Sequence, residues 1–272
     1  MQLRRVGCAA LRTVRTLPVM LANERVESSV THDPGAPVLL LSPHLDDSVL
    51  NCWSVLEGPS DVRVVNVFVG SPAAGLLTQW DRICGAGDSV THMRERIAED
   101  TEALALVGKV PTNLPFLDHM YRRCAPPPSL AEIDAAVSRA VPAASAVYGP
   151  AGVDHRDHRL MRRYAALIGR NGVPVRLYAD VPYATRFGWP PWVTGAAPDR
   201  HLDVDAHWEA NAFIPDRRFA EVVKLGEERS AVKLEAMRAY RSQLPALDAG
   251  PLRALSNPAV HGYEVFWEAH AA

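Results

Sequence analysis

A histidine and two aspartates, His44, Asp46 and Asp47, follow directly after a run of apolar residues. The length and composition of that run, residues 36–41, predict a strand that is buried on both faces of a parallel sheet. The apolar side chains of residues 49–56 recur at helical spacing, so a helix is expected to follow. Because open α/β sheets bind ligands at the carboxyl ends of their strands, the three polar side chains are expected at a ligand site. One imidazole and two carboxylates suit a divalent metal such as zinc.

A purely structural role is the alternative for this segment. Asp46 or Asp47 could cap the following helix, and His44 could be a buried turn residue. A cap requires one acidic group, so it accounts for neither the second aspartate nor the histidine. Metal binding is therefore the preferred interpretation.

A second cluster of the same kind occurs far along the chain. Residues 146–150 predict a short strand that enters a loop containing glycine and proline, and His155, Asp157 and His158 precede a segment with helical character. Two such clusters, each at the end of a strand, could meet across one sheet. Zinc hydrolases commonly combine three protein ligands with a position for water. The two clusters together therefore indicate a metal-dependent hydrolase.

These clusters resemble the two signature motifs of the PIG-L/LmbE-like zinc deacetylases. The first motif covers residues 43–47 and the second covers residues 155–158. With weaker matches further along, the resemblance extends over most of the chain from about residue 36 onward. It implies a hydrolase that removes an acyl group, in particular acetyl, from the amine of an amino sugar or of a metabolite that contains one.

The resemblance also implies a ligand set and a general base. By this comparison His44, Asp47 and His158 bind Zn²⁺, with Fe²⁺ as the alternative ion. Asp46 would take a proton from water and later deliver one to the amine. The sequence by itself does not say which of His155 and His158 binds the metal.

Two further catalytic roles follow from the same resemblance. His155 corresponds to the histidine that stabilises the tetrahedral intermediate, as a cationic imidazolium aimed at the developing negative charge. Asp157 corresponds to the acid that keeps this imidazole charged and oriented. Together with Asp46, these residues make up the expected catalytic set.

Arg96 and Asp118 are candidates for substrate binding. Arg96 belongs to a helix predicted over residues 93–107, and Asp118 ends a short strand-like segment. Both positions resemble family positions near bound substrate. Arg96 could instead form a surface ion pair with Glu99, which would add little stability, and Asp118 could simply cap the next turn.

Two positions depart from the family pattern. Ser48 stands where the family often has glutamate, which puts a contact to the metal ligands in doubt. Val153 stands where some members have a tyrosine that contributes to turnover. That tyrosine's role is then either absent or supplied by Tyr148 or Tyr183. Because of these departures, the substrates of the family are a weaker guide to the substrate of this chain.

Several segments outside the motifs carry structural expectations. Residues 219–244 are predicted to form a long helical region, and residues 264–267 to form a closing edge strand. The aromatic loop at residues 184–202 is interpreted as a lid on the pocket, with cover for the edge of the sheet as the alternative. Trp80, in a long loop over residues 71–91, could reach the site or could pin its own loop.

Composition excludes several classes of function. A net charge of −2 and an isoelectric point near 6.6 give no overall basic field for nucleic acid or for an anionic membrane. The chain contains no apolar run of about 18 residues, so no membrane span is expected. Its four cysteines are widely spaced, which argues against a disulfide framework and favours a cytoplasmic location. The expected partner is a small molecule, an N-acylated amino sugar, and a homo-oligomer is compatible with the sequence.

The expected fold is a single Rossmann-like α/β domain over residues 36–272, with a mostly parallel sheet and helices on both faces. Residues 1–35 are expected to be an N-terminal extension with an amphipathic helix. Two other functions remain open. One is a zinc amidase or cyclising hydrolase that acts on a non-sugar amide, and the other is a non-catalytic binding protein with the same fold.

Overall fold

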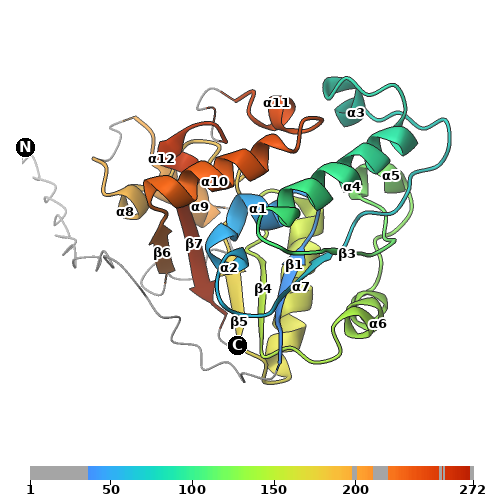
Figure 1. Ribbon diagram of the computed structural model, residues 1–272, viewed down its shortest axis with the longest axis horizontal. Helices are drawn as coiled ribbons and strands as arrows, with labels where there is room; N and C mark the ends of the chain where they lie inside the picture. The colour runs from blue at the N-terminus through green and yellow to red at the C-terminus, as the bar shows by residue number, and fades with distance from the viewer. Residues whose placement is uncertain (1–35, 198–200, 211–219, 251–252, 254, 270–272) are drawn as a thin grey trace, which may run out of the picture.

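The computed structural model describes residues 36–269, except for residues 198–200, 211–219, 251–252 and 254 (Figure 1). The expected N-terminal extension and its helix lie outside the described residues. None of the described helices is long and apolar enough to cross a membrane.

One sheet of seven strands forms the centre of the molecule, in the order β3-β2-β1-β4-β5-β7-β6. The strands are β1 (Val38–Ser42), β2 (Val62–Asn66), β3 (Thr112–Asn113), β4 (Ala146–Pro150), β5 (Val175–Tyr178), β6 (Ala220–Lys224) and β7 (Tyr263–Glu268). Strands β1 to β5 pair in parallel, whereas β7 runs antiparallel to both β5 and β6. The expected single α/β domain with a mostly parallel sheet is confirmed.

Helices cover both faces of this sheet (Figure 1). They are α1 (Asp47–Asn51), α2 (Trp53–Leu56), α3 (Gln79–Ile83), α4 (Ser89–Ala105), α5 (His119–Arg122), α6 (Leu130–Ala140), α7 (Arg156–Arg170), α8 (Pro191–Thr194), α9 (Val204–Ala210), α10 (Glu227–Arg238), α11 (Leu244–Leu247) and α12 (Pro258–His261). The crossovers from β1 through β2 to β3 lead one way along the sheet, and those from β4 to β5 lead the other way. Right-handed crossovers therefore place α1 and α4 on one face and α7 on the other.

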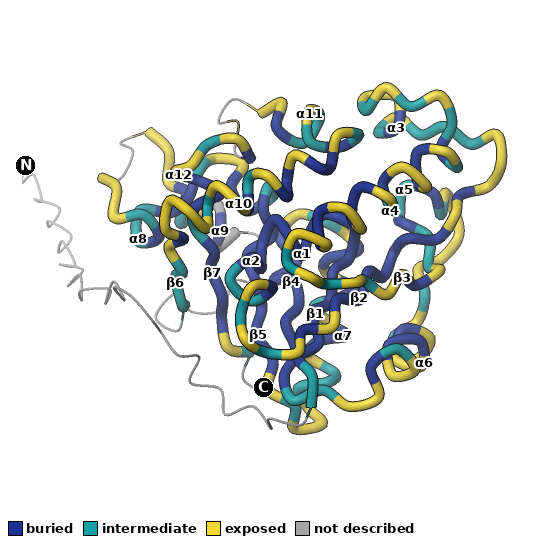
Figure 2. Tube along the Cα trace, in the orientation of Figure 1, coloured by how far each residue is buried: buried dark blue, intermediate teal, exposed yellow. Residues whose placement is uncertain are grey.

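The strand order reverses between β1 and β4, and these two strands are direct neighbours. Ligands of open α/β sheets bind at such a switch point, outside the carboxyl ends of the strands. All five residues of β1 are buried, as expected for an apolar run in the middle of a parallel sheet. Figure 2 shows the central strands buried and the outer helix surfaces exposed. The core thus provides a rigid base for the loops that follow β1 and β4.

Two sequence-based expectations about the second half of the chain are wrong. The region predicted to be helical over residues 219–244 begins with a strand, β6, and only its later part forms α10. The segment predicted to be an edge strand is β7, which lies between β5 and β6, so that β6 is the edge. The residues of β6 are only half-buried or exposed, and an edge strand of this kind lacks a strong apolar signal.

Candidate active site

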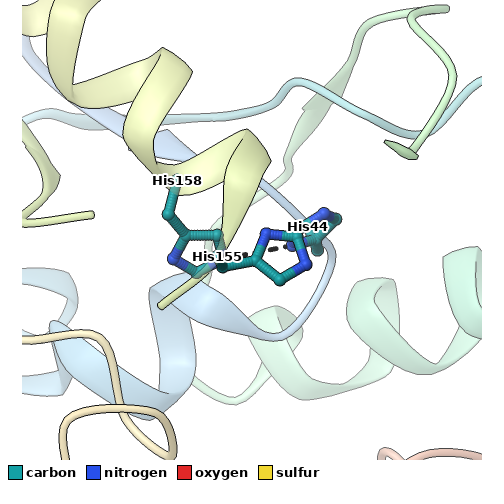
Figure 3. A group of neighbouring side chains, drawn as sticks. All are labelled: His44, His155 and His158. Atoms are coloured by element: carbon teal, nitrogen blue, oxygen red, sulfur yellow. Dashed lines mark hydrogen bonds between the residues drawn. The ribbon is translucent and has the colours of Figure 1, made fainter. Parts of the chain in front are cut away.

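The loops after β1 and β4 bring the two histidine-containing clusters together. His44 lies in the turn between β1 and α1, and His155 and His158 lie at the start of α7, directly after the loop that follows β4. Figure 3 shows the three imidazoles facing one another from these two segments. The sequence separation between His44 and His158 is bridged because β1 and β4 are neighbours in the sheet.

Three donor atoms of this cluster form a nearly equilateral triangle. The Nδ1 atom of His44 lies 3.3 Å from Oδ2 of Asp47, and Nε2 of His158 lies 3.3 Å from the same oxygen. The third side, between His158 Nε2 and His44 Nδ1, is 3.2 Å. A tetrahedral ion with bonds of roughly 2.0–2.1 Å requires ligand atoms separated by roughly 3.3–3.4 Å. The three side chains could therefore hold an ion of the size of zinc.

His155 lies close enough to the same ion position to be an alternative donor. The ligand atoms of His44, His155 and His158 lie within 4.8 Å of one another, so these three residues also form a group that could hold a metal ion. The donor set with Asp47 is the one whose three separations match those of a tetrahedral zinc site.

Buried carboxylates orient the two histidines of the triangle. Nδ1 of His158 lies 3.1 Å from Oδ1 of Asp180, which leaves Nε2 of the same ring facing Asp47. Nε2 of His44 lies 3.4 Å from Oδ2 of both Asp118 and Asp157. Metal-binding histidines usually donate their second ring N–H to a carboxylate in this way. The arrangement leaves one nitrogen of each ring available to a cation.

The charges of the site favour a cation among these groups. Burial opposes ionisation of Asp47, but the charges and hydrogen bonds of His158 and His44 hold the pKa of its carboxyl well below the usual value. Burial likewise opposes protonation of His158, but Asp47 and Asp180 raise its pKa to about 9. A metal ion satisfies the same carboxylates when it replaces the protons on its ligands.

Asp180 was not identified as a site residue from the sequence. It lies two residues after the end of β5 and is completely buried. Besides His158, it accepts a hydrogen bond from the backbone N–H of Val153. An acidic residue at the carboxyl end of a strand-like segment, residues 173–180, was the available signal, because the carboxyl ends of all parallel strands face the same edge of the sheet.

Asp157 has contacts other than those expected. It accepts hydrogen bonds from the guanidinium of Arg122 and, at 2.9 Å, from the backbone N–H of His119, and it lies beside His44. No hydrogen bond joins it to His155 among the described residues. Burial, together with the charges of His44 and His158, lowers the pKa of His155 to about 2. Asp157 therefore contacts Arg122, His119 and His44 instead of the His155 ring, and the role of that ring in catalysis stays a prediction.

A cavity of about 320 Å³ opens beside the triangle. The cavity is lined by His44, Asp46, Asp47, Leu50, Trp80, Arg96, Asp118, His119, Met120, His155, Pro182, Tyr183, Gln243 and Leu247. His158 is completely buried behind them. The cavity lining thus includes all the expected catalytic, substrate-binding and metal-binding residues except Asp157 and His158.

Asp46 is adjacent in sequence to the triangle and lines the cavity itself. Its side chain is buried, and it makes no side-chain cap to α1, which begins after it. Burial and the neighbouring charge of Asp47 raise the pKa of Asp46, whereas Arg96 and His44 lower it. The capping alternative for Asp46 is therefore excluded.

Arg96 is buried in the cavity wall and forms no surface pair. It is 5% exposed, and its Nε atom has no hydrogen-bond partner in the part of the chain that the structure describes. Glu99, the partner in the alternative interpretation, accepts hydrogen bonds from Ser242. Asp118 caps α5 by accepting a hydrogen bond from the N–H of Met120, and its other oxygen faces His44; substrate binding by Asp118 stays a prediction.

Two aromatic residues expected near the site, Tyr183 and Trp80, line the cavity. Tyr183 lies on the cavity wall with its ring 5.2 Å from that of His155, whereas Tyr148 packs in the core. Trp80 both lines the cavity and donates a hydrogen bond to Gln243, so it reaches the site and also pins its loop.

The interpretation of the loop at residues 184–202 as a pocket lid is wrong for its described residues. None of them lines the cavity. Trp189 and Trp192 instead pack against Trp208, which contacts Trp267 of β7. The loop covers the β7 side of the sheet, where Trp189 is buried and Trp192 is half-buried.

The chain matched no protein-family model and no curated protein. Among solved structures, it is similar to the A40926 pseudoaglycone deacetylase, with a TM-score of 0.62 and 26% identity over 87% of this chain and 98% of that one. It is also similar to a deacetylase from the biosynthesis pathway of teicoplanin, with a TM-score of 0.63 and 24% identity over 86% of this chain and 97% of that one. A complex of a deacetylase with teicoplanin gives a TM-score of 0.59 at 22% identity, over 86% of this chain and 98% of that one. The chain therefore has the fold of these deacetylases.

Proposed function

We propose that this chain is a metal-dependent hydrolase of the PIG-L/LmbE-like type, which removes an acyl group, acetyl in the first instance, from the amine of an amino sugar. The observation that carries this proposal is the triangle of donor atoms from His44, Asp47 and His158, with sides of 3.2–3.3 Å. The similarity to the A40926 pseudoaglycone deacetylase, at 26% identity over nearly its whole length, supports acyl removal as the reaction.

His44, Asp47 and His158 would hold the ion, Zn²⁺ or Fe²⁺, with Asp180 and Asp118 orienting the two rings. A bound divalent ion would lower the pKa of a water molecule towards about 7 and would polarise the amide carbonyl. The second ring nitrogen of each histidine faces a carboxylate, which fixes the tautomer that leaves the other nitrogen free to bind.

Asp46 would act as general base and then as general acid. Its carboxylate lines the cavity beside the donor triangle, where it would take a proton from the attacking water. The same proton would pass to the amine nitrogen as the carbon–nitrogen bond breaks, so that the products are a free carboxylate and an amine. Burial of Asp46 suits this exchange, since a raised pKa brings the carboxyl nearer to the operating pH.

His155 would stabilise the oxyanion as a neutral hydrogen-bond donor. Its ring lies on the cavity wall between those of His44 and Tyr183, at 4.8 and 5.2 Å. A pre-positioned N–H in a water-poor site can stabilise developing negative charge without being cationic. Tyr183 is the candidate for the role that Val153 cannot fill.

Arg96 and Asp118 would bind substrate hydroxyl groups. A cavity of about 320 Å³ is at the small end of ligand pockets, which suits one sugar ring with its acylamino group. The unpaired Nε of Arg96 provides a buried donor for an oxygen of this ring.

Residues 36–272 would form the catalytic domain, and a cytoplasmic location fits the three free cysteines of the described chain, Cys52, Cys84 and Cys124. The subunit count is best measured directly by light scattering.

Metal analysis and an acylamino-sugar panel test this function. Purified protein is expected to contain about one divalent ion per chain, because a catalytic zinc site uses three protein ligands to hold one ion. The variant His44→Ala should lose this ion. Acetate release should occur with N-acetylated amino sugars. Activity confined to non-sugar amides would reject the sugar substrate, and a metal-free protein without hydrolytic activity would reject the enzyme in favour of a binding protein.

A further inference from the structure

A second cavity, of about 500 Å³, lies next to the active-site cavity and is lined mainly by arginines. The arginines are Arg122, Arg123, Arg156, Arg159, Arg162 and Arg163, and we refer to this cavity as the arginine pocket. Asp157 is the one acidic residue in its lining, and His119 lines both cavities. A chain with a net charge of −2 thus concentrates six arginines around one hollow.

The arginines come from two elements. Arg156, Arg159 and Arg163 are spaced by three and four residues along α7, so they share one face of this helix, and Arg162 adjoins that face. Arg122 ends α5 and Arg123 follows it. The pocket therefore lies where the segment after α5 faces the first turns of α7.

Contacts among the described residues offset only part of this charge, at Arg122 and Arg162. Asp157 pairs with Arg122, which also donates to the backbone carbonyl of Leu117 at 2.7 Å. Across the described ranges of the chain, the exposed side chains of Arg123, Arg156, Arg159 and Arg163 form neither a hydrogen bond nor an ion pair.

Like charges at this helical spacing repel one another and destabilise the helix. At Arg162, burial and the charges of Arg159 and Arg163 lower the pKa of the guanidinium, whereas Asp180 raises it. Arg162 also donates a hydrogen bond of 3.0 Å to the backbone carbonyl of Ala151, which gives it a structural role that the exposed Arg156, Arg159 and Arg163 lack among the described residues. A bound anion would supply the missing counter-charge.

We propose that the arginine pocket binds a multiply charged oxyanion of the phosphate type. Guanidinium groups donate pairs of parallel N–H bonds that match the oxygens of phosphate, and such charge-assisted bonds are among the strongest polar contacts of proteins. The volume of about 500 Å³ accepts a diphosphate or a phosphate with part of the molecule that carries it.

The anion can be part of the substrate or a separate ligand. Asp157 connects the two cavities, because one of its oxygens pairs with Arg122 while the other lies 3.4 Å from Nε2 of His44. His119 forms part of both walls. An acylamino sugar that bears a phosphate could therefore place its amide at the donor triangle and its phosphate among the arginines. This assignment to the substrate rests on the proposed function, whereas anion binding itself does not.

Calorimetric titration of the metal-loaded protein with pyrophosphate at low ionic strength tests anion binding. The double variant Arg159→Ala/Arg163→Ala is compared with Arg139→Ala/Arg170→Ala, which removes the same charge from exposed positions outside both cavities. Saturable binding is expected for the wild type and the control, with at least about tenfold weaker binding for the pocket variant. Metal content is measured before and after, because pyrophosphate also chelates divalent ions. Absence of saturable binding, or equal losses in both double variants, would overturn the proposal.

A substrate comparison then distinguishes the two sources of the anion. A higher kcat/KM for N-acetylglucosamine 1-phosphate than for N-acetylglucosamine, with the advantage lost in Arg159→Ala/Arg163→Ala, assigns the anion to the substrate. Pyrophosphate binding without such a preference supports a separate anionic ligand. If no amide is hydrolysed but pyrophosphate still binds, the proposed function fails and the anion site stands.

Discussion

Replacing Asp180 by asparagine is expected to weaken metal binding while leaving all three proposed ligands in place. Asp180 is completely buried, lies 3.1 Å from Nδ1 of His158, and accepts the N–H of Val153. An asparagine of the same shape keeps one acceptor oxygen but loses the negative charge that holds the His158 ring in its binding tautomer. Its amide N–H₂ group would also face either the backbone N–H of Val153 or Nδ1 of His158, and both of these donors need an acceptor.

The expected loss follows from this geometry. Removal of a carboxylate that orients a metal-binding histidine weakens metal affinity by about 10–100-fold. This range corresponds to about 1.4–2.8 kcal/mol. The upper part of the range applies here because Asp180 is the carboxylate bound to Nδ1 of His158, and both partners are completely buried.

Competition with a chromophoric chelator measures the zinc affinity of wild type and variant, and thermal melting of the metal-free proteins checks that both are folded. Asp134→Asn is the matched control, because Asp134 also accepts a side-chain hydrogen bond, from Tyr164, but lies on the exposed side of α6. A folded Asp180→Asn protein with unchanged zinc affinity would refute the reasoning. Affinity lost equally in the control would refute it as well.

Three further predictions concern catalysis, pH and metal removal. Asp46→Asn should retain the metal and lower kcat by about 10²–10⁴-fold, as measured by acetate release, since the proton acceptor is lost; near-normal turnover would remove Asp46 from this role. Burial raises the pKa of Asp100 from 3.8 to about 8 despite hydrogen bonds from Tyr240 and Asn66. The contribution of Asp100 to the free energy of unfolding is therefore fully present below pH 4 and is lost as the pH rises through 8. The free energy of unfolding falls by at most about 1.4 kcal/mol per pH unit in this range. Melting curves should show a smaller decline in Tm between pH 5 and 8 for Asp100→Asn than for wild type, and parallel declines would contradict the assignment. Removal of the metal by a chelator should lower Tm and readdition should restore it, because the ion binds the folded state alone; an unchanged Tm would argue against the site.

Local patterns in the sequence account for the elements that carry the site. The apolar run before His44 predicts a fully buried β1, and the structure has every residue of that strand buried. The signal is strong because a strand covered on both faces must be apolar throughout. β6 was missed for the opposite reason, since its half-exposed residues resemble those of the helix that follows.

The residue types of the two clusters, and their positions after strands, are determined by the sequence alone. Which atoms of those residues meet is decided by the tertiary structure. Only the pairing of β1 with β4 brings His44 Nδ1 to 3.2 Å from His158 Nε2. The contact of α5 with the start of α7 places Asp157 beside Arg122 and the backbone N–H of His119. Distances of this kind depend on strand order, which no local spacing encodes, because the loops between neighbouring strands of a parallel sheet are long.

Asp180 and the arginine pocket illustrate the same division. Asp180 is one acid among many in the sequence, and burial beside His158 is what gives it a role. Arg122 and Arg163 belong to separate segments that line one cavity only after α5 and α7 pack at the same end of the sheet. Charge counted along the chain averages to −2, whereas folding gathers six positive side chains in one place. The sequence determines which groups are available for chemistry, and the packing of distant elements decides which of them act together.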